Sequence, residues 1–135
     1  MKIYLLSHGK LASGMKNTIE LLAGDQPNLV AFDSYLPNGP DLTVFLQKLA
    51  QEKEQFIVVT DLLGGSVNRL ALEKLVSNNI YLISGMNTAL VLSLVLLDAK
   101  CTVDQIQKIV DTSKDTVRLL LPSQNSATNE TEEDF

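Results

Sequence analysis

Apolar residues along this chain fall into two alternating patterns, short continuous runs and stripes with helical spacing. The continuous runs are typical of strands buried on both faces, and they predict strands at residues 2–7, 29–34, 56–60, 80–84 and 116–121. The stripes predict helices that begin near residues 11, 42, 66, 88 and 103. Strands that alternate with helices form βαβ units with right-handed crossovers. The sequence therefore predicts an α/β three-layer sandwich, in which helices cover both faces of a mostly parallel sheet.

Glycines and polar residues mark the expected helix ends. Gly24 is placed to end the first helix, and Asp41, Ser66 and Asn87 stand where they would cap the second, third and fourth helices. The fourth helix, over residues 88–97, is apolar on nearly every side. Such a helix must be buried, either centrally or against a second subunit, and we favour a dimer interface.

Composition separates a folded body from a polar tail. The chain has 135 residues and a net charge of −5, but residues 130–135 hold four acids and no base. The body is therefore nearly neutral and gives no reason to expect nucleic acid or an anionic membrane surface as a partner. We expect one domain over residues 1–121, followed by a disordered acidic tail over residues 122–135, which has no apolar periodicity.

Cysteine content and hydropathy bear on the compartment. Cys101 is the only cysteine, which excludes an intramolecular disulfide and fits a packed thiol in a reducing environment. The first strand begins directly after Met1, so no signal peptide is expected. The longest apolar stretch, residues 89–97, is shorter than the roughly 20 residues that span a bilayer. We expect a cytoplasmic protein.

Candidate catalytic residues follow two of the predicted strands. His8, the only histidine, follows the first strand, and Asp61 follows the third. Ligands of open parallel sheets bind at the carboxyl ends of the strands. An imidazole can attack an electrophile through one nitrogen while a carboxylate holds the proton on the other. The pair therefore indicates nucleophilic chemistry on His8, although a structural histidine and a carboxylate that caps loop N–H groups remain the alternatives.

A glycine turn completes the predicted edge. Gly64 and Gly65 would let the backbone approach an anion, and Ser66 begins a helix whose amino terminus favours negative charge. A tight turn with a helix cap is the plainer interpretation of the same residues. Asn87, after the fourth strand, is either a simple cap or a further residue of the same crevice.

Missing motifs narrow the chemistry further. The sequence has no P-loop, no G-x-G-x-x-G and no nucleophile elbow. With one histidine and one cysteine, a metal site would need mostly carboxylate ligands, and the sequence shows no such cluster. We therefore expect neither a metal nor a cofactor. Without a P-loop, a phosphoryl group would not come from a nucleotide bound to this chain. It would have to arrive on one partner and leave on another.

Three segments resemble the mannose-class (mannose, fructose, sorbose) enzyme IIA domains of the bacterial phosphoenolpyruvate-dependent sugar phosphotransferase system. They are SHGKLASG at residues 7–14, TDLLGGS at residues 60–66 and GMN at residues 85–87. With the strand order and length, the resemblance covers residues 1–121. Many members have a proline after the serine, whereas this chain has Val67-Asn68-Arg69, which suggests a subgroup with a different sugar or partner.

The resemblance implies a phosphotransferase that works as a phosphoryl carrier. His8 would accept phosphate from a histidine of the carrier protein HPr and pass it to a histidine of a separate enzyme IIB. Asp61 would hydrogen-bond His8, and Ser66 would lie beside the phosphate. The resemblance also implies a homodimer in which the last strand, residues 116–121, is exchanged at the sheet edge, and contact with the membrane only through the transporter complex.

Two other functions remain open at the level of sequence. One is a different enzyme with a strand-end histidine, such as a histidine phosphatase or a tetrapyrrole chelatase. Against the phosphatase, Ser7 rather than an arginine precedes His8, and no second histidine exists. The other is a regulatory or interaction domain of the same fold without obligatory transfer to a transporter.

Overall fold

One parallel sheet organises the molecule, whose computed structural model describes residues 1–124. Within that range the strands are β1 (Lys2–His8), β2 (Leu29–Ser34), β3 (Phe56–Thr60) and β4 (Ile80–Ile83), in the order β2-β1-β3-β4. All three pairings are parallel. The order places β1 and β3 side by side in the middle, so the residues that follow them share one edge.

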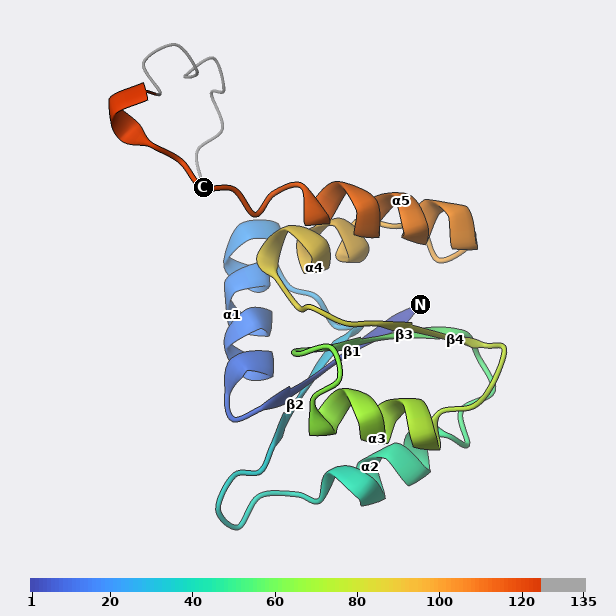
Figure 1. Ribbon diagram of the computed structural model, residues 1–135. Coiled ribbons are helices and arrows are strands. Elements are labelled where there is room, and N and C mark those ends of the chain that lie inside the picture. The colour runs from blue at the N-terminus through green and yellow to red at the C-terminus, as the bar shows by residue number, and fades with distance from the viewer. Residues whose placement is uncertain (125–135) are drawn as a thin grey trace.

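Helices cover both faces of the sheet, which confirms the three-layer prediction. The first face carries α1 (Leu11–Ala23), α4 (Thr88–Val95) and α5 (Val103–Lys114), and the second carries α2 (Leu42–Leu49) and α3 (Ser66–Lys74) (Figure 1). No helix in residues 1–124 has the length and apolar character needed to cross a membrane.

The side chains of β1 show why its apolar run is continuous. Ile3 and Leu5 belong to the core under α1, α4 and α5, whereas Tyr4 and Leu6 belong to the core under α2 and α3. Successive residues of a strand point to opposite faces. A central strand covered on both faces therefore needs apolar residues at every position.

The apolar helix α4 packs one face into the first core. It contacts α1 and α5, and Leu90, Val91 and Leu94 are buried there. Leu96, directly after the helix, is exposed. The dimer interface that we favoured for this helix involves a second subunit and therefore stays a prediction.

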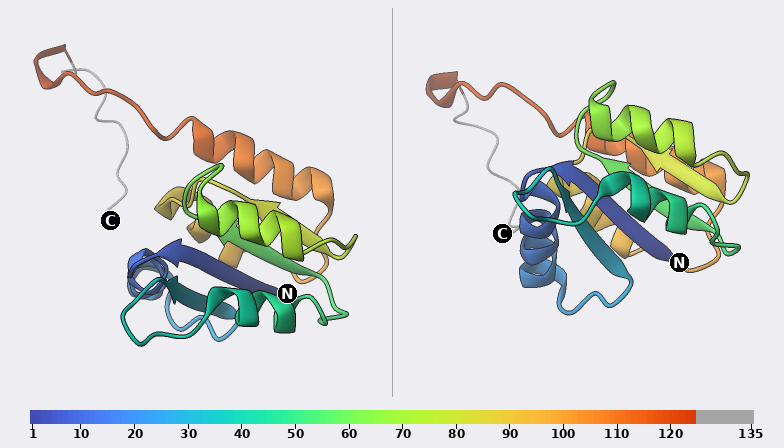
Figure 2. Two further views of the ribbon diagram at one scale, coloured as in Figure 1. Left: turned by 60° about the horizontal axis from the view of Figure 1, so that its bottom comes forward. Right: turned by 90° about the horizontal axis from the view of Figure 1, so that it is seen from below.

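The predicted strand over residues 116–121 is not formed in the single chain. Residues 117–121 have no regular structure, and Val117 and Leu119 are among the most exposed apolar side chains. Beyond α5 this segment runs away from the body of the fold (Figures 1 and 2). A strand needs a neighbour for its backbone hydrogen bonds, and the chain offers none at this place. Residues 122–124 form a 3-10 turn, and the rest of the predicted tail lies outside the described residues.

Three of the four predicted helix ends are confirmed. Gly24 follows α1 with a φ of +82°. Asp41 accepts a hydrogen bond from the backbone N–H of Val44, and Asn87 accepts one from that of Leu90. The fourth expected cap, Ser66, has a different role that belongs to the site.

Candidate functional site

His8 is the last residue of β1 and lies at the carboxyl edge of the sheet. The chain turns sharply after it, because Gly9 adopts a φ of +57° and donates its N–H to the carbonyl of Ser34. A left-handed turn of this kind suits a glycine. The His8 side chain remains 46% exposed, so its ring is fixed at the edge yet open to a partner.

Asp61 lies against His8, as the sequence predicted. Its Oδ2 accepts two hydrogen bonds from His8, one from the backbone N–H and one from Nδ1, both at 2.8 Å. Its Oδ1 accepts the N–H of Leu62 at 2.8 Å. Three donors therefore converge on one carboxylate, whose side chain is only 10% exposed.

These donors keep Asp61 ionised. Burial by itself would raise the pKa of the carboxyl, but the hydrogen bonds from the backbone and ring of His8 and from Leu62 outweigh it, so the pKa lies below its usual value. An ionised carboxylate only accepts hydrogen bonds, so Nδ1 of His8 carries the proton. In the neutral ring, Nε2 then holds the free electron pair.

Ser66 lies on the other side of the imidazole. Its Oγ is 3.0 Å from Nε2 of His8. The prediction that Ser66 caps α3 is wrong, because the cap position is Gly65 and the serine is the first helical residue. No side chain in the described part of the chain caps this helix. Its amino terminus therefore keeps backbone N–H groups free beside Nε2, an arrangement that attracts anions.

The turn that precedes α3 is held by a residue that sequence reasoning left unplaced. Gly64 has a φ of +78°, and its N–H donates to Oδ1 of Asn68. The Nδ2 of Asn68 donates in turn to Oγ1 of Thr60 at 2.9 Å. Asn68 is buried next to Val67 on the inner face of α3. A polar residue on that face of the predicted helix was the available signal.

Tyr35 is the second residue that sequence reasoning missed. It follows β2, and its hydroxyl donates to Oγ of Ser66 at 3.1 Å. Its ring centroid lies 5.2 Å from that of His8. Position at the end of a strand was the only signal in the sequence, because residues 36–40 indicated nothing beyond a turn.

Asn87 is not joined to these residues. Its side chain accepts the N–H of Leu90 and donates to the carbonyl of Gly85. Among residues 1–124, no hydrogen bond links it to His8, Asp61 or Ser66. The same range contains no group of three His, Cys, Asp or Glu side chains able to hold a metal ion.

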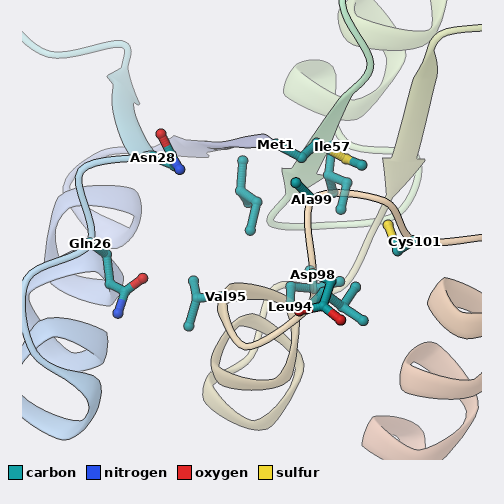
Figure 3. A pocket seen from close by; sticks show the side chains of 11 residues that line it. Met1, Gln26, Asn28, Ile57, Leu94, Val95, Asp98, Ala99 and Cys101 are labelled. Carbon is teal, nitrogen blue, oxygen red and sulfur yellow. The ribbon is translucent and has the colours of Figure 1, made fainter.

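A small cavity of about 150 Å³ opens elsewhere, near the amino ends of the strands. Met1, Ile57, Asn28 and Cys101 contribute to its walls (Figure 3). It shares no residue with the His8 site. Two other hollows adjoin the His8 site, one lined in part by Ser66 and one lined in part by Tyr35.

Comparisons with known proteins agree on one family. The model of the family described as PTS system fructose IIA component matches residues 2–111. A Klebsiella pneumoniae protein assigned as a phosphoenolpyruvate-dependent sugar phosphotransferase system permease is 29% identical, with a TM-score of 0.79 over 87% of this chain and 89% of that one.

Two further solved structures are similar to this chain, one in sequence and fold and the other in fold alone. The EIIA component from Streptococcus agalactiae is 25% identical, with a TM-score of 0.73 over 87% of this chain and 95% of that one. The mannose/sorbose-specific IIA subunit from Enterococcus faecalis shares the fold, with a TM-score of 0.77 at 15% identity over 88% and 93% of the two chains. No curated protein matches the chain in sequence.

Proposed function

The chain belongs to the family of PTS fructose IIA components, which has a phosphotransfer role in sugar uptake, and from this premise we propose that it carries a phosphoryl group on Nε2 of His8. The donor is phospho-HPr, and the acceptor is a histidine of enzyme IIB. The observation that carries the proposal is the orientation of the imidazole. Asp61 holds Nδ1–H, which leaves the electron pair of Nε2 directed away from the carboxylate.

The transfer is an exchange of one N–P bond for another. The electron pair of Nε2 forms the new bond to phosphorus, while the N–P bond of the donor breaks and its electron pair returns to the donor imidazole. The proton on Nδ1 of His8 stays in its hydrogen bond to Asp61. The carboxylate thereby offsets the positive charge that the ring gains, as the aspartate of a Ser-His-Asp triad does for the imidazolium that forms there.

Negative charge on the phosphoryl group is met from the other side of the ring. Ser66 supplies a hydroxyl next to Nε2, and the uncapped amino terminus of α3 supplies backbone N–H groups. Fixed donors of this kind stabilise charge without reorganising during the reaction. Catalysis of phosphoryl transfer consists mostly of such positioning and electrostatic stabilisation.

The surface around His8 suits contact with partner proteins. Leu11, at the start of α1, and Leu62 and Leu63, after Asp61, are all exposed on segments that flank the histidine. Exposed apolar side chains gathered near a site are typical of protein interfaces. We propose that HPr and IIB each cover these leucines when their own histidine approaches His8.

We also propose that the chain forms a homodimer through its last segment. In residues 1–124, β4 pairs with β3 on one side and leaves its other edge open. A groove beside that edge is lined by residues of β4 and by Val103, Ile106 and Val110 around α5. The exposed apolar segment 117–121 of a second copy would supply the missing neighbour.

The test uses the natural route of phosphate. The protein is incubated with enzyme I, HPr and phosphoenolpyruvate, and its intact mass is compared with that of a His8→Ala variant. We expect one added phosphoryl group, labile in acid and stable in base, on the wild type alone. Since His8 is the only histidine, no other residue can hold a phosphohistidine. A wild-type protein that gains no phosphoryl group from active phospho-HPr would refute the carrier function.

A further inference from the structure

Tyr35 holds an unusual backbone conformation immediately beside His8. Its φ is +62°, in the left-handed region that residues with a Cβ rarely adopt. Burial does not account for it, because the residue is 56% exposed. Such conformations are often retained at functional sites, so the contacts of the side chain show what the conformation serves.

The Tyr35 side chain reaches both residues on the open side of the imidazole. Its ring lies over the edge of the site, 5.2 Å from the His8 ring with a tilt of 41° between the two planes. Its hydroxyl lies 3.1 Å from Oγ of Ser66 and donates a hydrogen bond to it. Tyr35 therefore contacts the nucleophile through its ring and the neighbouring serine through its hydroxyl.

The directions of the hydrogen bonds follow from Asp61 outward. The carboxylate accepts Nδ1–H of His8, so Nε2 has no proton and must accept. Ser66 then donates its single hydroxyl proton to Nε2. Because that proton is committed, the serine oxygen is an acceptor for Tyr35. Tyr35 therefore donates to Ser66, Ser66 donates to Nε2 of His8, and Nδ1 of His8 donates to Asp61.

We propose that Tyr35 is a positioning residue for phosphoryl transfer and that it acts through Ser66. Its hydroxyl occupies the acceptor side of the serine oxygen and so keeps the serine proton aimed at the place where the N–P bond forms. Once phosphorus is bonded to Nε2, the same proton is directed to a phosphoryl oxygen. The inference rests on the proposed function, since it assigns Tyr35 a role in the same reaction.

A double-mutant cycle tests this role. Tyr35→Phe keeps the ring and removes the hydroxyl, and it is measured alone and together with Ser66→Ala. The readout is the rate of transfer from phospho-HPr, resolved into kcat and KM by varying the donor. Tyr4→Phe is the matched control, because it removes a phenol hydroxyl on the same side of the sheet from a buried core residue outside the site.

The expected result separates an indirect role from a structural one. Loss of one neutral hydrogen bond predicts a kcat about three- to tenfold lower for Tyr35→Phe, with KM within about twofold of wild type. In the Ser66→Ala background the same substitution has no further effect, because its partner is gone. Thermal unfolding of Tyr35→Phe stays at the wild-type temperature, and Tyr4→Phe keeps the wild-type kcat.

Two results would overturn the inference while leaving the carrier function intact. One is a wild-type kcat in Tyr35→Phe. The other is an equal fractional loss with and without the Ser66 hydroxyl, which would show that Tyr35 acts independently of the serine. A wild-type protein that accepts no phosphoryl group would overturn the carrier function itself and the role of Tyr35 with it.

Discussion

Replacing Asp61 by asparagine should slow phosphoryl transfer far more than the similar shape of the two side chains suggests. Both carboxylate oxygens of Asp61 accept N–H donors, two from His8 and one from Leu62. An asparagine has one accepting oxygen, and its NH₂ group must face at least one of these donors. Either the ring of His8 or the backbone at the end of β3 therefore loses its partner.

The magnitude follows from the bond that is lost. Hydrogen bonds to charged groups contribute about 1.5–3 kcal/mol, and each 1.4 kcal/mol or so changes a rate tenfold. The hydrogen bond from Nδ1–H of His8 to Asp61 is strongest when the ring is positively charged in the transition state. Asp61→Asn should therefore lower kcat by about 10- to 100-fold. The asparagine also permits the other tautomer of His8, in which Nε2 carries the proton and cannot attack.

Rapid-quench measurement of phosphate transfer from phospho-HPr gives the relevant rate. Asp33→Asn is the matched control, because Asp33 is the penultimate residue of β2, which pairs with β1, but accepts its hydrogen bonds from Ser13 rather than from His8. The control should lose less than about threefold. If Asp61→Asn transfers phosphate as fast as wild type, or no more slowly than the control, the argument that Asp61 orients the His8 ring and stabilises its positive charge is refuted.

Three further predictions concern stability and assembly. Asn68→Ala should lower the free energy of unfolding by about 2–4 kcal/mol, because it removes one buried and one partly buried hydrogen bond. The exposed control Asn17→Ala should change it by less than about 0.5 kcal/mol in the same urea titration. The lowered pKa of Asp61 stabilises the fold at pH values above the unfolded carboxyl pKa of about 3.9, and this contribution is lost as the pH falls through the lower folded-state pKa. The difference in unfolding free energy between wild type and Asp61→Asn should therefore narrow below pH ~4. A difference that widens there would contradict the lowered pKa. Replacing Leu119 and Leu120 together by lysine puts a charge on both faces of the proposed exchanged strand and should convert dimer to monomer in sedimentation equilibrium, whereas an unchanged dimer would exclude pairing through that segment.

The strands were predictable where burial alone determines them. Residues 29–34 and 56–60 form strands with the predicted bounds, and every residue of the central strand β3 is buried. Residues 116–121 are also mostly apolar, yet their strand does not form in the single chain. An apolar composition indicates that a segment can pair as a strand, but pairing also requires an accessible sheet edge. The sequence does not specify whether that edge belongs to the same chain or to a second copy.

The site was predictable to the extent that topology determines it. His8 and Asp61 follow neighbouring parallel strands, so their meeting is a consequence of strand order. The roles of Ser66, Asn68 and Tyr35 depend on side-chain directions at the first turn of a helix and on a left-handed residue in a loop. Neither feature has a periodic pattern in the sequence, and Asn87 shows that position at a strand end does not by itself bring a residue to the site.

The most direct test of the carrier function is to locate the phosphorus atom on the histidine. The protein labelled with ¹⁵N is phosphorylated by phosphoenolpyruvate, enzyme I and HPr, and phosphorus–nitrogen coupling is recorded by NMR. We predict coupling to Nε2 of His8, with the Nδ1 proton still in its hydrogen bond to Asp61. Phosphorus bonded to Nδ1, or to any residue other than His8, would contradict the orientation of the imidazole on which this mechanism depends.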